Sequence, residues 1–196
     1  MFQRYNIRDY TTLMEIEKSE PQYSASERKK FGTHKHELKS TVFKYYFFEG
    51  FFDNVGLSDM DMQYVSHGYS PVRISPSGEE TRLFTVHHIK PLTCLGETKP
   101  SNLIPLPRGF HNFIHRRIID PQISGMAPGD KKVLVAMPDF SKITLDMMMD
   151  SGFQLQYHKY VVDQYKMFPS EFNKHGMIKN PQFISNWYLN TFGPKK

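Results

Sequence analysis

Five residues able to bind a metal ion or move a proton lie close together in this chain of 196 residues. They follow the pattern His87-His88-x13-Asn102-x8-His111-x3-His115. Imidazole nitrogens bind divalent transition metals, and histidine titrates near neutral pH, so it also serves as an acid or a base. The pattern therefore predicts a site at which a bound ion and a general base act together.

Two strand-like segments hold the first part of the pattern. Thr81–Ile89 is rich in β-branched and aromatic residues, which favours a strand that ends at the histidine pair. Asn102–Pro107 is a short apolar segment broken by Pro105, which is typical of an edge strand or a very short one. Residues 90–101 contain two prolines and a glycine and predict an irregular loop between the strands.

A helix is expected to hold the second part. From Arg108 onward, apolar residues recur at helical spacing, and Asp120-Pro121 is expected to end the helix. His111 and His115 are four residues apart, so they lie one above the other on one face and can bind the same ion.

The two strand histidines must have different roles. Consecutive strand residues point to opposite sides, so His87 and His88 do not easily enter one coordination sphere. If His87 supplies the third imidazole, His88 is suited to deprotonate an attacking water. Three histidines could also form a structural zinc site, but such sites usually close a shell of four ligands. Three ligands and an open position fit catalysis better.

The whole arrangement, over about residues 81–119, resembles the HNH motif of the ββα-metal (His-Me finger) nucleases. It is most similar to the colicin-type DNase toxins and related polymorphic-toxin nucleases, which carry the extra histidine on the helix. The resemblance implies an α+β fold, with a ββα-metal finger embedded in a mainly helical single domain. It also implies one divalent metal ion, Zn, Ni, Mg or Mn.

The resemblance assigns a role to each residue of the pattern. His87, His111 and His115 would hold the metal, and His88 would be the general base. Asn102 would tie the two strand arms together and help to orient the base. The implied products carry a 5′-phosphate and a 3′-hydroxyl.

The sequence departs from the family in two places. Colicin-type enzymes often have an acidic residue two positions before the histidine pair, where this chain has Thr85. Arg82 or Arg108 would then serve as the phosphate-binding cation, and the sequence does not choose between them. The paired Cys-x-x-Cys knuckles of other HNH branches are absent, since Cys94 is the single cysteine.

The positive charge of the chain is concentrated around the histidines. The formal net charge is +5, and residues 82–117 hold six Lys or Arg against one Glu. We therefore expect a polyanionic partner, with phosphate contacts that carry no sequence information. The residues expected to bind nucleic acid are Arg82, Lys90, Arg108, Arg116 and Arg117.

The rest of the chain predicts a single domain with no membrane span and no secretory signal. Helices are expected within Arg8–Lys18 and Ser26–Asp53, so residues 1–60 form a helical N-terminal part. Residues 63–80 are expected to form turns, including a hairpin loop at 75–80. His34 and His36 are interpreted as a surface helix end.

Residues 130–196 are expected to form a strand followed by helices. The strand is Lys131–Met137, and the next helix, capped by Asp139 or Ser141, carries Met147–Met149 against the core. Further helices are expected over Tyr157–Phe168 and Phe172–Phe192. His158 and His175 receive no role, and most of the abundant aromatic residues are expected to build the core.

These observations favour a DNase with little sequence specificity. The resemblance adds the role of a bacterial toxin, secreted or delivered into a target cell to act in its cytoplasm, with a small acidic immunity protein. The alternatives are an RNase, a defence or homing nuclease of the same fold, and a catalytically silent domain that binds nucleic acid or another partner.

Overall fold

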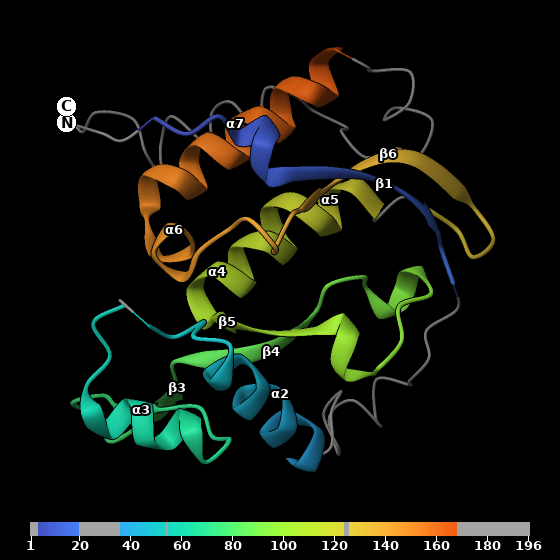
Figure 1. Cartoon of the computed structure of the whole chain (residues 1–196). Helices are drawn as coiled ribbons and strands as arrows, with labels where there is room; N and C mark the ends of the chain where they lie inside the picture. Colours follow the sequence, from blue (N-terminus) through green and yellow to red (C-terminus); the bar gives the residue numbers. More distant parts are fainter. Residues whose placement is uncertain (1–3, 20–35, 54, 124–125, 168–196) are drawn as a thin grey trace.

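The computed structural model describes residues 4–19, 36–53, 55–123 and 126–167. Within these ranges the chain has an α+β fold, in which helices pack around three small antiparallel sheets of two strands each. Figure 1 shows the longest helix, α7 (Ser151–Met167), at one end of the molecule, and α2 (His36–Phe48) and α3 (Asp59–Ser66) at the other. The strands that carry the histidine pattern lie between these ends.

The N-terminal segment forms a strand, so the helix expected over Arg8–Lys18 is wrong. A 3-10 turn, η1 (Ile7–Tyr10), leads into β1 (Thr11–Glu17). This strand pairs antiparallel with β6 (Lys131–Pro138), whose predicted position is confirmed. Two adjacent threonines begin β1, and β-branched residues fit a pleated surface better than a helix. The long-range pairing therefore overrides the weak helical pattern.

The predicted strand over Thr81–Ile89 is two strands in different sheets. β3 (Glu80–Arg82) pairs with β2 (Val72–Ile74) across the predicted hairpin loop, which is confirmed. β4 (Phe84–His88) pairs antiparallel with β5 (Leu103–Pro107). Leu103, Ile104 and Leu106 are almost fully buried, so β5 lies in the core although it has a single partner strand.

The helix after β5 does not end at Asp120-Pro121, which corrects the prediction. It runs through α4 (Arg108–Phe113), a π-helical turn, η4 (Ile114–Ile119), and α5 (Asp120–Ile123). Pro121 has no N–H to donate, and its ring crowds the preceding turn of an α-helix. The wider π turn accommodates it, with the Asp120 N–H donating to the His115 carbonyl five residues earlier.

The end of this helix is anchored to the β1/β6 sheet by one buried amide. The Gln122 Nε2 donates to the Ala136 carbonyl at 2.7 Å, and the Ala136 N–H donates to Gln122 Oε1 at 2.8 Å. Because both hydrogen bonds are buried, they fix the helix against β6 in one register.

Helix α2 packs against β5 on the side away from α4, and α3 packs against α2. The helix predicted within Ser26–Asp53 is confirmed from His36 onward as α2 (His36–Phe48); the earlier part lies outside the described residues. The prediction of turns from residue 63 missed the end of α3 (Asp59–Ser66). A capping box between Ser58 and Asp61 begins α3, and this pattern is visible in the sequence.

Helix α3 is tied to the β2/β3 hairpin by an ion pair. The Arg73 guanidinium donates to both oxygens of Asp61, at 2.7 and 2.6 Å. The hydrogen bonds to Arg73 hold the pKa of the buried Asp61 carboxyl at about 2, despite its burial, and Ser58 adds to the effect. Asp61 therefore caps its own helix and joins it to the next element.

The C-terminal helices begin at other residues than predicted. α6 (Leu145–Met149) is capped by Thr144, because Asp139 instead accepts hydrogen bonds from Ser141 within a turn. α7 begins six residues before the predicted Tyr157. The helix predicted over Phe172–Phe192, with His175, lies outside the described residues, as does His34.

Aromatic and aliphatic residues form one core, as predicted for the aromatic residues. Phe52, Phe110, Phe153 and Tyr157 are among the largest fully buried side chains. Met147 and Met148 pack into the same core, whereas Met149 is 60% exposed. Among the described residues, no helix is long and apolar enough to cross a membrane.

Candidate metal centre

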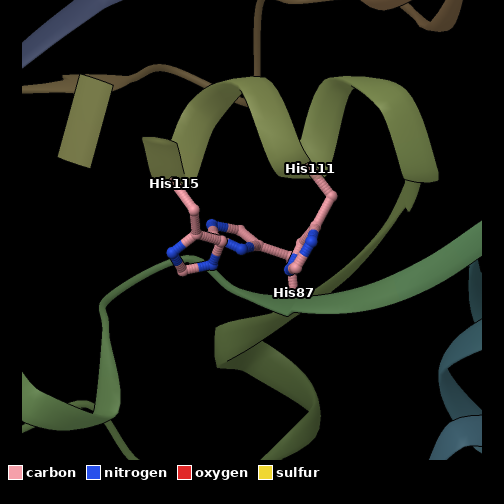
Figure 2. A group of neighbouring side chains, drawn as sticks. All are labelled: His87, His111 and His115. Atoms are coloured by element: carbon pink, nitrogen blue, oxygen red, sulfur yellow. The ribbon is translucent and has the colours of Figure 1, made fainter. Parts of the chain in front are cut away.

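Three of the predicted residues meet at one point between β4 and the following helix. His87 comes from the strand, His111 from α4 and His115 from η4 (Figure 2). One ring nitrogen from each histidine lies within 4.8 Å of the others. The three nitrogens are near enough to share one ion after small side-chain rotations, and three imidazoles suit a divalent transition metal such as zinc.

The group is buried on one side and open on the other. His87 is 1% exposed, and the Phe140 ring lies with its centroid 5.6 Å from that of His87. His111 and His115 are partly exposed. An ion held here would therefore keep a coordination position accessible from outside, as catalytic zinc sites do and structural sites do not.

A carboxylate stands behind one of the candidate ligands. Nδ1 of His115 lies 3.3 Å from Oδ1 of Asp120. If Nδ1 carries the proton, Nε2 is left to bind a metal, and the carboxylate increases the basicity of the ring. The two residues are five apart, a spacing that the π turn places on one face and an α-helix would not.

His88 does not belong to this group and is held separately. Its Nε2 lies 3.0 Å from the Thr98 hydroxyl in the loop between β4 and β5. In the tautomer in which Nε2–H donates to Thr98, Nδ1 is the basic nitrogen. The strand thus directs its two histidines to different partners, in agreement with the alternation of strand side chains.

Asn102 joins the end of β4 to the loop that carries Thr98. Its Oδ1 accepts from the Lys90 N–H at 2.8 Å, and its Nδ2 donates to the carbonyls of Lys90 and Glu97, at 3.0 and 2.8 Å. Because Lys90 follows His88 by two residues and Glu97 precedes Thr98, the amide holds both partners of the His88 contact in place.

Gly96 lets the loop close onto the strand end. A Cβ on Gly96 would collide with the Lys90 carbonyl oxygen and lie 2.7 Å from that of Pro91. The adjacent Leu95 takes a left-handed backbone conformation, with φ of 61°. The sequence does not reveal this close approach, although it does place a glycine in the loop.

Four of the five predicted nucleic-acid-binding residues line two cavities. Arg82 and Arg108 line a cavity of about 640 Å³ together with His111, here called the α2/α3 pocket. Arg116 and Arg117 line a cavity of about 260 Å³, and Asn112 lies between the two. Lys90 lines neither of them.

His158, which received no role from its sequence, lines the smaller cavity and is almost fully buried. Burial and, as the smaller cause, the charge of Arg117 together lower its pKa to about 4. The ring is therefore neutral at physiological pH and sits beside a permanent cation. His158 therefore stays uncharged in the pH range in which an ordinary histidine titrates.

Sequence reasoning did not find three residues that position the histidines: Thr98, Asp120 and Phe140. Thr98 belongs to an irregular loop, and the contact of Asp120 depends on a π turn that no α-helical pattern predicts. Phe140 lies more than fifty positions after His87. A carboxylate shortly after a helical histidine was the one signal available, and it points to Asp120 once the helix is known to continue.

Comparison of the chain with models of known protein families, with curated proteins and with solved structures gives no match.

Proposed function

We propose that this protein is a metal-dependent endonuclease of the ββα-metal (HNH) type, which hydrolyses DNA phosphodiester bonds with little sequence specificity. One observation carries the proposal. A buried strand histidine meets two helix histidines, while the next strand residue, His88, is oriented by a threonine hydroxyl. This arrangement would separate a metal site from a general base, a division of roles that suits phosphodiester hydrolysis.

The elements around the site support the same assignment. β4 and β5 form an antiparallel pair, and the helix that follows β5 packs its histidines against β4. This order of strand, loop, strand and helix supports the proposed ββα-metal finger over residues 81–119. Asn102 holds the loop of that finger as the resemblance implies.

His87, His111 and His115 would hold one divalent ion: Zn, Ni, Mg or Mn. When bound, the ion supplies Lewis-acid stabilisation of the negative charge that develops on the phosphate and on the leaving oxygen. Asp120 orients His115 for this purpose. The partly exposed side of the group leaves room for the phosphate.

His88 acts on the attacking water. Its basic nitrogen takes a proton from the water as the water oxygen bonds to phosphorus. The bond from phosphorus to the 3′ oxygen breaks, and that oxygen takes a proton from solvent, which leaves a 5′-phosphate and a 3′-hydroxyl. Thr98 and Asn102 keep the ring in one orientation during the transfer.

Cleavage of plasmid DNA and of structured RNA tests the proposal. Purified protein is incubated with each substrate in Mg²⁺, Mn²⁺, Ni²⁺ or Zn²⁺ and with a chelator. We expect loss of plasmid that needs metal and that falls at least about hundredfold in His88→Ala, since general-base catalysis contributes that much or more. His67→Gln, which changes an exposed histidine at the end of α3, is the matched control and keeps full activity.

The other outcomes separate the alternatives. Cleavage of RNA alone would assign the protein as a ribonuclease of the same fold. Binding of nucleic acid without cleavage in any metal would favour a silent binding domain. If His88→Ala cleaves as fast as the parent protein, the assignment of the base is wrong.

The toxin role extends the proposal to the cell. The resemblance and the basic site imply a small acidic immunity protein, and a route that delivers the nuclease into the cytoplasm of a target cell. We expect expression of the active protein alone to stop bacterial growth and His88→Ala to relieve the block. Normal growth of cells that make the active form in their cytoplasm would contradict this role.

A further inference from the structure

The α2/α3 pocket lies directly against the candidate metal centre. Its walls come from α2, α3, the β2/β3 hairpin, the first half of β4 and the start of α4, which lie together in the lower half of Figure 1. Thr85 and Val86, which immediately precede His87, line it, and so does His111. A polymer whose phosphate sits at the histidines would therefore extend into this pocket.

The charged residues of the pocket favour an anion. Lys39, Arg82 and Arg108 line it against a single carboxylate, that of Glu80. None of the three cations forms an ion pair with another residue that the structure describes. Burial lowers the pKa of Lys39, and the nearby Arg82 guanidinium lowers it further. Two cations that repel each other across one cavity are stabilised by a bound anion such as a phosphate.

The aromatic residues of the pocket favour a flat ring beside that anion. Tyr64 and Tyr69 line it and are 47% and 48% exposed, so their faces are accessible. His36 adds a third ring, with its centroid 5.5 Å from that of Tyr69. Nucleobases stack on exposed rings of this kind, and the stacking tolerates any base.

We infer that the α2/α3 pocket binds an unpaired nucleotide next to the scissile phosphate, with its phosphate on Lys39 and Arg82 and its base on Tyr69. A paired base hides both faces in the helical stack, so this contact selects a single-stranded segment. The volume of about 640 Å³ lies within the range of pockets that enclose a small ligand. This inference rests on the proposed nuclease function and adds a preference for unpaired substrate.

The smaller cavity provides an internal contrast. Arg116 and Arg117 line it, but no tyrosine does. It offers phosphate contacts, but the rings that line it, Phe113 and His158, are partly and almost fully buried, so they present less accessible faces than Tyr64 and Tyr69. The base is therefore assigned to the α2/α3 pocket.

Binding in the presence of chelator tests the pocket separately from catalysis. The probes are a short fluorescein-labelled oligothymidylate and a blunt duplex of the same length, measured by fluorescence anisotropy with the full chain. We expect the single strand to bind more tightly than the duplex. Tyr69→Leu and Lys39→Gln should each weaken single-strand binding about tenfold, the scale of one lost stacking or phosphate contact.

Matched controls come from the exposed face of α2, the helix that carries Lys39. Tyr45 is 57% exposed and Lys44 is exposed, and neither lines the pocket. Tyr45→Leu and Lys44→Gln should leave binding within about twofold of the parent, since they remove no contact with the strand. Tyr69→Phe keeps the ring and should keep the affinity, which separates stacking from a folding defect.

Two results would overturn the inference. One is equal binding of duplex and single strand by the parent protein, and the other is unchanged single-strand affinity in Tyr69→Leu. Neither depends on cleavage, because chelator removes the metal. Failure of the nuclease proposal would instead appear as absence of hydrolysis in every metal while the pocket variants still lose binding.

Discussion

The histidine group and the α2/α3 pocket share His111, yet they are built differently. The histidines come from a strand and from the helix that follows its partner strand, so neighbouring elements bring them together. The pocket combines two helices, a hairpin and the start of α4, which long-range packing assembles. The metal site is thus defined by local structure and the pocket by tertiary contacts, and each can be disturbed without the other.

The largest effect is expected for a variant that disrupts the histidine group and leaves the α2/α3 pocket intact. His115→Ala removes one of three candidate ligands and does not alter the pocket lining. Loss of a carboxylate partner alone lowers metal affinity tenfold to hundredfold, so loss of a ligand should lower Zn²⁺ affinity at least about hundredfold. Calorimetric titration with Zn²⁺ measures this, and His67→Gln serves as the control. A parallel loss of oligothymidylate binding in chelator would show that the two sites are not independent.

The reverse experiment breaks the pocket and spares the histidines. Gly68 has φ of 88°, and a Cβ there would collide with the Ser40 hydroxyl and lie 2.9 Å from the Ser40 Cα on α2. Gly68→Ala should therefore destabilise the fold by about 2 to 3 kcal/mol and weaken oligothymidylate binding. Denaturant unfolding measures the first effect and anisotropy the second.

Gly78→Ala is the matched control for this change. Gly78 has a similar φ of 83°, but no atom lies within 4 Å of its would-be Cβ. Gly78→Ala should lower the free energy of unfolding by about 1 kcal/mol, which is the cost of backbone strain alone. Equal costs for the two variants would contradict the close packing of α2 against α3, and so would unchanged oligothymidylate binding in Gly68→Ala.

A smaller effect is expected from low pH, which should weaken the wall of the α2/α3 pocket by protonating Asp61. Because the pKa of Asp61 is lowered from 3.8 to about 2, the ion pair with Arg73 contributes fully above about pH 4. Its contribution, about 2 kcal/mol, should be lost as the pH falls toward 2. Unfolding by denaturant between pH 2 and pH 5 measures the change, and Asp61→Asn should remove it. Identical pH dependence of the two proteins would contradict the assignment.

The smallest expected effect is on the orientation of one ligand. Asp120→Asn removes the charge behind His115 and should weaken Zn²⁺ binding about tenfold, the lower end of the effect of such partners. Asp53→Asn, which changes an exposed carboxylate after α2, should leave the affinity unchanged. An unchanged affinity in Asp120→Asn would mean that the carboxylate does not orient the ring.

The sequence predicted the parts of the molecule that depend on neighbours. The spacing of His111 and His115, the short strand before them and the strand Lys131–Met137 all follow from local periodicity and composition. The meeting of His87 with the helix pair follows from the same local order. For this reason the sequence alone predicts that these three histidines lie together.

The sequence could not predict what depends on distant partners. β1 was interpreted as a helix because its hydrogen bonds go to β6, more than a hundred positions away. Tyr64, Tyr69 and Lys39 show no pattern that links them to the histidines, and packing of α2 against α3 alone brings them together. The contact of Thr98 with His88 is likewise not predictable, because the conformation of a loop leaves little trace in its residue types.

Because of the π turn, the geometry of the site depends on the number of residues between Ile114 and Ile119. Each residue turns an α-helix by about 100°, so deletion of one residue between Ile114 and Ile119 would rotate everything after it by that angle. Asp120 would then face away from His115, or Gln122 away from Ala136 on β6, because the rotated helix cannot satisfy both. The number of residues in this helical segment, more than their identity, therefore sets the orientation of Asp120 and Gln122 relative to their partners.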